Sequence, residues 1–457
     1  MTMISVAESG QPATTASLSY DESAENGRDV PTQSDSHPPV VENTEKSLEH
    51  ASFPDGGLQA WLTVAGAFLI QVCQFGYTSS FGVYQDFYVR EYITNVSPSA
   101  VSWIGSTNAF ITIAGGVISG RLYDRGYFYY LIWGGCSLSV FSLFMLSLAK
   151  PNHYYQVFLS HGIGAGLGGG IIYIPSVAVM SQYFQRRRAL AMTIVASGAS
   201  LGAVIHPIML NHLFHSKLGF GNSVRASAGL VGGLLLTACC LMRTRLPVQK
   251  KHVDQRQILR KLVKDKPYVF TSLALFTFSI GFYFPQFYLQ LDATTHHLSP
   301  TFSFYSLVIV NFCSGFGRIA SGLVANKINV ADMVVVSSFA ISVVIFGMIG
   351  LASVTSVVLI GIFYGFFIGI YVGLNGPLLV MLTSDLSELG VRMGIAYLFS
   401  GLGSLIGPPI SGALLTDKFI WWKPAVFNGA MAMLGASFYL LMAIFHRRAL
   451  TAGASKS

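Results

Sequence analysis

Long apolar stretches separated by short polar segments dominate this chain from residue 54 onward. A helix needs about 20 residues to cross the hydrocarbon core of a bilayer, and apolar stretches of that length recur along the sequence. They predict twelve membrane-spanning helices, at Trp61–Val83, Ser102–Gly120, Tyr129–Ala149, Val157–Gln182, Ala189–Leu210, Ala226–Met242, Tyr268–Leu289, Phe302–Ala325, Ala331–Ala352, Val357–Thr383, Met393–Leu415 and Pro424–Phe445. The pattern therefore indicates an all-α integral membrane protein.

Landmarks in the sequence recur at one common offset, which indicates an internal duplication. The paired landmarks are Gly120 with Gly322, Pro175 with Pro377, and Pro207 with Pro409. The only long basic stretch between spans separates the sixth span from the seventh. We therefore expect two pseudo-repeated six-helix bundles, residues 54–243 and 267–446, joined by a linker at 244–266.

Composition and charge extend this picture to the chain's ends and orientation. Hydrophobic residues make up 52% of the chain and charged residues 11%, whereas about 25% is usual in soluble domains. Residues 1–53 are polar and acidic, which predicts a disordered tail, and 447–457 form a second tail. Lys and Arg gather in alternate loops, so we expect both termini in the cytoplasm. The net charge of +8 reflects this bias and not a nucleic-acid surface.

Glycines in the fourth and tenth spans recur every four residues, which places each set on one helix face. The sets are Gly162, Gly166 and Gly170, and Gly361, Gly365, Gly369 and Gly373. They allow either plain close packing or a surface for sliding between moving helices. Pro175 and Pro377 are expected to kink the same two helices.

The loop Gly120–Gly126, GRLYDRG, resembles the G-x-x-x-D-R/K signature of the major facilitator superfamily. Gly120, Asp124 and Arg125 match it. The second copy keeps Gly322 and Lys327 but has Asn at position 326. The resemblance implies the major facilitator fold, with this motif acting as a gate on the cytoplasmic side.

Further segments are similar to the monocarboxylate-porter family, especially its fungal branch. They are PDGGLQAW at 54–61, FGVYQDFY at 81–88, YFQRRRALA at 183–191, FYFPQFYL at 282–289, GRIASGLVAN at 317–326 and IGPPISG at 406–412. The resemblance implies a carrier of a small organic anion or weakly acidic metabolite. Ser79 and Ser314 replace a lysine and an acid of the lactate carriers, which argues against lactate–proton symport.

Arg318 is the one charge that the sequence places clearly inside a span. A charge near the bilayer centre costs about 2.5–3.5 kcal/mol on insertion scales, so such residues usually face a cavity. The family match favours pairing with a substrate carboxylate. Snorkelling to the interface and structural pairing are the alternatives.

Uncharged polar and aromatic residues inside the spans are further candidates. His206 and His161 are candidates for proton coupling, with hydrogen-bonded packing as the alternative. Six more candidates for substrate contact or helix-to-helix bonding are Asn108, Tyr173, Asn311, Asn375, Phe282 and Tyr283. All acidic residues after the tail are expected in loops or at helix ends, so coupling would use histidine or the substrate's own proton.

The function expected from the sequence is secondary transport by alternating access, in a plasma membrane, of a small molecule alone or together with a proton. No metal cluster, cofactor motif or catalytic triad is recognisable in the sequence. Export of a secondary metabolite is favoured. A non-transporting nutrient sensor and an uptake carrier for a vitamin or carboxylate remain the alternatives.

Overall fold

The computed structural model describes residues 55–96, 98–245, 255–415 and 420–454. In this part of the chain, helices merge into twelve segments that are long and apolar enough to cross a membrane. The predicted number of spans is confirmed. The predicted tail at 1–53 lies outside the described residues, as do residues 246–254 of the linker.

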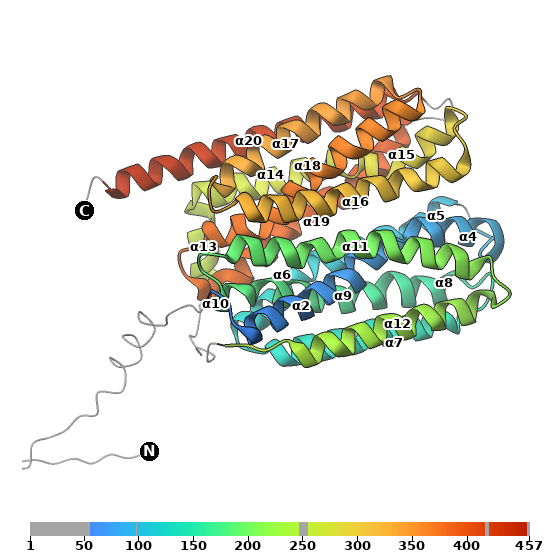
Figure 1. Cartoon of the computed structure of the whole chain (residues 1–457), viewed down its shortest axis with the longest axis horizontal. Coiled ribbons are helices and arrows are strands. Elements are labelled where there is room, and N and C mark those ends of the chain that lie inside the picture. The colour runs from blue at the N-terminus through green and yellow to red at the C-terminus, as the bar shows by residue number, and fades with distance from the viewer. Residues whose placement is uncertain (1–54, 97, 246–254, 416–419, 455–457) are drawn as a thin grey trace, which may run out of the picture. The chain divides into compact units, whose positions relative to one another are not determined.

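The first half holds six of these segments, several of them interrupted (Figure 1). Its helices are α2 (Leu58–Cys73), α3 (Phe75–Thr78), α4 (Phe81–Phe87), the π-helix η1 (Tyr88–Tyr92), α5 (Pro98–Ala114), α6 (Gly116–Asp124), α7 (Phe128–Ser147), α8 (Tyr154–Val157), the π-helix η2 (Phe158–Gly164), α9 (Ala165–Ala178), α10 (Met180–Tyr183), α11 (Arg188–Phe214) and α12 (Gly219–Leu241).

The second half repeats this plan after the linker helix α13 (Gln255–Lys264). Its helices are α14 (Lys266–Phe282), α15 (Phe284–Thr295), α16 (Pro300–Val324), α17 (Val330–Gly347), the 3-10 turn η3 (Met348–Gly350), α18 (Val354–Met381), the 3-10 turn η4 (Leu386–Glu388), α19 (Leu389–Leu415) and α20 (Trp422–Ala454). We call the end of the bundles where α13 lies the linker end, and the opposite end the far end (Figure 1).

Several spans are longer than their apolar cores predict. The first continues beyond Val83 to Tyr92, and the seventh beyond Leu289 to Thr295. The last helix runs to Ala454, so most of the predicted tail at 447–457 is helical. These extensions carry polar side chains that find partners inside the protein: the Tyr92 hydroxyl, for example, donates to the Ala149 carbonyl at 2.5 Å. Hydropathy alone does not register such partners.

The glycine faces pack helices together within each half. A Cβ on Gly166 would lie 3.1 Å from the Asn108 carbonyl oxygen on α5, and a Cβ on Gly369 would lie 2.1 Å from the Ser314 carbonyl oxygen on α16. Backbones this close require the missing side chain. Most positions of each face are covered by a helix of their own half, which supports the packing interpretation, and Gly373 also approaches Thr193 of the first half. Pro377 lies inside the continuous helix α18, whereas α9 ends three residues after Pro175.

The two halves meet through helices that correspond to one another in the duplication. The fifth span, α11, packs against α16 and α18, and the eleventh, α19, packs against α5 and α6. The close backbone approaches between the halves lie towards the linker end: a Cβ on Gly120 would be 2.1 Å from the Gly390 carbonyl oxygen. By contrast, the principal contacts of α4 and α15 at the far end stay within their own halves.

Gly369→Ala is expected to lower the melting temperature of the purified protein. The new methyl group would overlap the Ser314 carbonyl, and overpacking of this kind typically costs about 1–3 kcal/mol. Gly134→Ala is the matched control, because nothing lies within 4 Å of a Cβ at that helical position. Thermal unfolding in detergent measures both variants. Equal melting temperatures would contradict tight packing of α18 on α16.

Candidate functional site

An aromatic cluster with one guanidinium lies where the halves meet. Tyr173 of α9 and Tyr397 of α19 have ring centroids 5.4 Å apart, and their hydroxyls are close enough to share a hydrogen bond. Arg318 of α16 lies within electrostatic range of Tyr173. Phe75 of α3 meets Tyr173 edge-on at 4.8 Å, and Tyr283 also lies in range of Tyr173. We call these five residues the central cluster.

Only some of the hydrogen-bond donors of Arg318 have partners in the protein. One terminal nitrogen, Nη1, donates to the Ala196 carbonyl of α11, which ties the two halves together. Its Nε is buried and has no hydrogen-bond partner among the described residues. One helical turn away, Ser314 accepts a hydrogen bond at 3.3 Å from Ser200 of the other half. Arg318 therefore combines a structural contact with an unused donor, which an anionic ligand can accept.

The predicted amide candidates do not gather at this cluster. Asn108 donates to the His161 carbonyl at 2.8 Å and accepts from Thr78 at 3.1 Å, all within the first half. Asn311 donates to the Leu307 carbonyl of its own helix at 2.9 Å. In the second half, the Tyr439 hydroxyl lies within hydrogen-bond range of the Asn375 side-chain oxygen. The amides bond to nearby groups of the protein because a buried amide in apolar surroundings needs a hydrogen-bond partner.

Phe282 and Tyr283 lie at the break between α14 and α15, with their ring centroids 4.5 Å apart. The Phe282 ring lies 5.9 Å from Tyr371 within the second half, and its carbonyl accepts a hydrogen bond from Tyr364. Tyr283, the residue of the break itself, belongs to the central cluster. Of the seven predicted substrate contacts, the structure brings Arg318, Tyr173 and Tyr283 together.

The two candidate histidines lie in a separate tyrosine-rich core of the first half. His161 Nδ1 lies 3.3 Å from the Tyr88 hydroxyl. His206 meets the Tyr77 ring edge-on at 5.3 Å. The His206 ring nitrogens lack a hydrogen bond of normal geometry within the described chain, although the Val72 backbone is a polar neighbour. Both histidines are buried, in agreement with a packing role.

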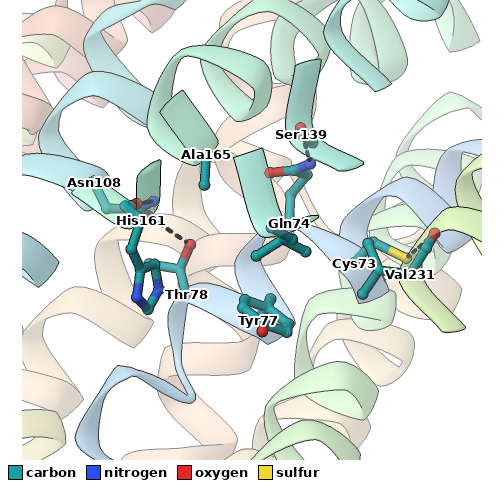
Figure 2. A pocket seen from close by; sticks show the side chains of 10 residues that line it. Cys73, Gln74, Tyr77, Thr78, Asn108, Ser139, His161, Ala165 and Val231 are labelled. Atoms are coloured by element: carbon teal, nitrogen blue, oxygen red, sulfur yellow. Dashed lines mark hydrogen bonds between the residues drawn. The ribbon is translucent and has the colours of Figure 1, made fainter. Parts of the chain in front are cut away.

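A small cavity adjoins this core (Figure 2). Its lining includes Gln74, which donates to Ser139 at 2.9 Å, together with Thr78 and Asn108. The space open to the centre of a water molecule is about 20 Å³, and about 10–15 Å³ accommodates one water. The cavity is thus of the size for water and not for a metabolite.

Asp124 joins the halves at the linker end. Its carboxylate accepts hydrogen bonds from the backbone N–H groups of Gly390 at 2.9 Å and Val391 at 2.8 Å. These groups belong to the first turn of α19, where unpaired N–H groups and the helix dipole favour a negative charge. We call Gly120, Asp124, Gly390 and Val391 the linker-end seam.

The other residues of the predicted gate motif have different surroundings. A Cβ on Gly322 would lie 1.9 Å from Thr193 Oγ1 of α11, so this glycine also permits close contact between the halves. Arg125 and Lys327 are exposed. In the described parts of the chain neither side chain forms a hydrogen bond or ion pair. The motif's glycines and its acid, but not its cations, make the contacts.

Asp55 makes a second carboxylate cap that the sequence did not indicate. It accepts from the backbone N–H groups of Gln185 at 2.7 Å and Arg186 at 2.8 Å, and from Arg187. Partial burial acts to raise the pKa of Asp55, but these N–H groups outweigh it and hold the pKa below its usual value. Asp55, the acid of the PDGGLQAW segment, thus fixes the loop that leads into α11.

Arg392 and Glu388 anchor the linker helix. Arg392 Nη1 lies 3.0 Å from Asp265 and its Nε lies 3.6 Å from Glu388, which in turn pairs with Lys261 of α13 at 3.0 Å. Arg392 and Glu388 are both buried. The linker therefore docks on the start of the eleventh span, next to the linker-end seam.

One acid at a helix end, Asp292, is buried in a way that the sequence did not predict. The seventh span runs to Thr295 instead of ending at Leu289, so Asp292 lies within α15 and is fully buried. Its ion-pair partner is His296, at 3.0 Å. A helical turn brings residues four apart together, and this pairing was readable from the sequence once the helix was extended.

Tyr397 is the site residue that the sequence interpretation missed. It shares a face of α19 with Gly390, Gly394 and Gly401, which all approach the first half closely. Their spacing of three and four residues is that of one helix face. This small-residue pattern is the signal that could have identified Tyr397.

Comparisons with known proteins agree with this architecture. Residues 63–408 match the Major Facilitator Superfamily. The aspyridones efflux protein apdF of Emericella nidulans is 36% identical over 399 residues, which cover 87% of this chain and 79% of that protein. The fujikurins efflux protein of Gibberella fujikuroi is 36% identical over 396 residues, covering 85% and 83% respectively.

A solved structure of a transporter of this superfamily, FucP in the outward conformation, has the same fold. The TM-score is 0.66 at 14% identity, over 84% of this chain and 98% of that one. The predicted fold of two six-helix bundles is thereby confirmed, and the relatives are transporters and not enzymes. The chain is a multi-pass membrane transporter that belongs to the Major Facilitator Superfamily.

Proposed function

We propose that this transporter exports a small organic anion or weakly acidic metabolite with aromatic or conjugated character, in the manner of the monocarboxylate porters that it resembles. The observation that carries the proposal is Arg318, with an unused buried donor beside the aromatic rings between the halves. A guanidinium pairs with a carboxylate or acidic hydroxyl, and aromatic rings favour a flat apolar body.

Similarity to named efflux proteins supports the direction of transport. The relatives called efflux proteins for aspyridones and fujikurins cover most of this chain. Export fits a plasma-membrane location with the linker end and both termini in the cytoplasm, because the basic loops and linker gather at that end. Uptake of a nutrient and a sensor without transport are the alternatives that the experiments below distinguish.

The way in which the halves are joined supports alternating access. Each half satisfies most of its polar groups internally, whereas the seam at the linker end rests on a few backbone approaches and the Asp124 cap. Rocking of the halves about the central cluster would break this seam and expose Arg318 to the linker side. Asp124 and the glycines at positions 120 and 322 would then act as the gate.

The substrate is best identified by comparing metabolites inside and outside cells that contain or lack the gene, followed by flux in proteoliposomes. Accumulation of an acidic metabolite inside cells that lack the gene supports export. Its loss from those cells would support uptake instead. Absence of flux for every differing metabolite, with intact reconstituted protein, would favour the sensor.

Arg318→Ala is expected to reduce flux of the identified metabolite by at least about tenfold. Removing one charge of a buried ion pair typically costs about 2–5 kcal/mol. Arg225→Ala is the control, because Arg225 is exposed and its guanidinium bonds to Asn222 of its own helix at 3.0 Å. Expression and melting temperature are measured alongside. Wild-type flux in a folded Arg318→Ala protein would refute anion pairing.

Asp124→Asn is expected to slow turnover about fivefold while the apparent KM changes less than about twofold. The amide keeps an acceptor but loses the charge that the start of α19 stabilises, an effect of about 0.3–2 kcal/mol. Initial rates over a range of substrate concentration separate the two quantities. Asp332→Asn is the control, since Asp332 pairs with Arg447 within the second half. A change confined to KM would contradict the gate role.

A further inference from the structure

Asp292 is a buried carboxylate with little compensation. Asp292 is 0% exposed. Neither of its carboxylate oxygens has a hydrogen bond of normal geometry within the described residues. The Nδ1 atom of His296 lies 3.0 Å from Asp292 Oδ1 and 3.0 Å from the Asp292 carbonyl oxygen, with the better hydrogen-bond geometry towards the carbonyl. The imidazole is thus placed between the two oxygens.

In the part of the chain that the structure describes, His296 is the partner available to balance the charge of Asp292. The helix α15 packs against α14, α16, α18, α19 and α20, and among the described residues the one ion-pair partner found for this carboxylate is His296 of its own helix. An uncompensated carboxylate in apolar surroundings is strongly disfavoured. The buried position of Asp292 is therefore stable when the pair carries one proton, either as an ion pair with imidazolium or as a neutral acid beside neutral imidazole.

A proton can reach and leave the pair through His296, whose side chain is 33% exposed. When the pair loses its proton, the remaining negative charge is favoured only if α15 moves so that water reaches the carboxylate. The helix has a point at which it can move, because the backbone breaks at Tyr283, immediately before α15. Tyr283 belongs to the central cluster, which links this movement to the interface between the halves.

The corresponding helix of the first half lacks a pair that is sensitive to proton loss in this way. There α4 also follows a break, at Ser79 and Ser80, and Asp86 at its end pairs with Arg90 at 2.6 Å. That pair is exposed on both sides, and arginine keeps its charge throughout the ordinary pH range. The two halves differ in this respect although they are built alike.

We propose that Asp292 and His296 form a proton-binding site in which the bound proton holds α15 against the second half and its loss releases α15. The site reports the pH at the far end of the bundle. It goes beyond the proposed export function, because it concerns how protons bias the conformation whichever metabolite is carried.

Cysteine accessibility tests the proposal without a known substrate. Ala293 adjoins Asp292 and is 0% exposed, so Ala293→Cys is protected while α15 is docked. The rate of labelling by a polar maleimide is measured in detergent from mildly acidic to mildly alkaline pH, with the parent protein as background. The double variant Asp292→Asn/Ala293→Cys corrects for the reactivity of the thiol itself, because an amide needs no proton to stay buried.

The ratio of the two labelling rates is expected to rise by at least about fivefold with increasing pH, the lower end of common coupling strengths. Adding His296→Gln should move the rise to lower pH, since Asp292 must then hold the proton alone. Adding Asp86→Asn should leave the profile unchanged. A ratio that does not vary with pH would overturn the proposal.

Leu289→Cys provides a second reporter in case Ala293→Cys does not fold. Leu289 is also 0% exposed and lies one turn earlier in α15. The same ratio is measured with Asp292→Asn, and a flat profile at this position would equally rule out the proton-binding site. Because no transport is measured, failure of this test leaves the export proposal to be judged by its own experiments.

Discussion

The hydrocarbon interior of a bilayer offers no hydrogen bonds, and this constraint organises the whole protein. Helices satisfy the backbone, and side-chain polar groups must find partners in neighbouring helices. Asn108 and Asn375 do so inside opposite halves, as does Gln74 with Ser139. Glycine faces allow the backbones to approach, as Gly369 does at Ser314. Much of the polar pairing is thereby completed within each half.

The halves pack on each other through α11 with α16 and α18, and through α19 with α5 and α6, whereas the polar contacts described between them are few. Arg318 and the tyrosines of the central cluster form the middle, and the Asp124 cap on α19 forms the linker end. Such contacts involve few groups and can be exchanged as the halves move, whereas the packed interiors cannot. The proposed functions rest on two polar groups, Arg318 with its unused donor and the buried Asp292 with His296 as its partner.

The duplication produces two halves that share a plan but not their chemistry. The acid of the first gate motif, Asp124, has Asn326 as its counterpart, and Asp55 caps the loop before α11 from within the first half. The pairs Asp86–Arg90 and Asp292–His296 occupy matching far-end helices, one exposed and one buried. The internal symmetry thus sets the architecture. Departures from it place charged side chains in different surroundings in the two halves.

The sequence by itself determined the twelve spans, the duplication and the glycine faces, because apolar length and helical spacing are local properties of the chain. The tertiary structure decided which polar residues meet. Asp124 and Gly390 are 266 positions apart, and no local pattern sets the register between such distant helices. For this reason neither the place of Tyr397 at the interface nor the burial of Asp292 was predicted from the sequence. Whether a polar side chain faces a cavity, a neighbour or water depends on what packs against it.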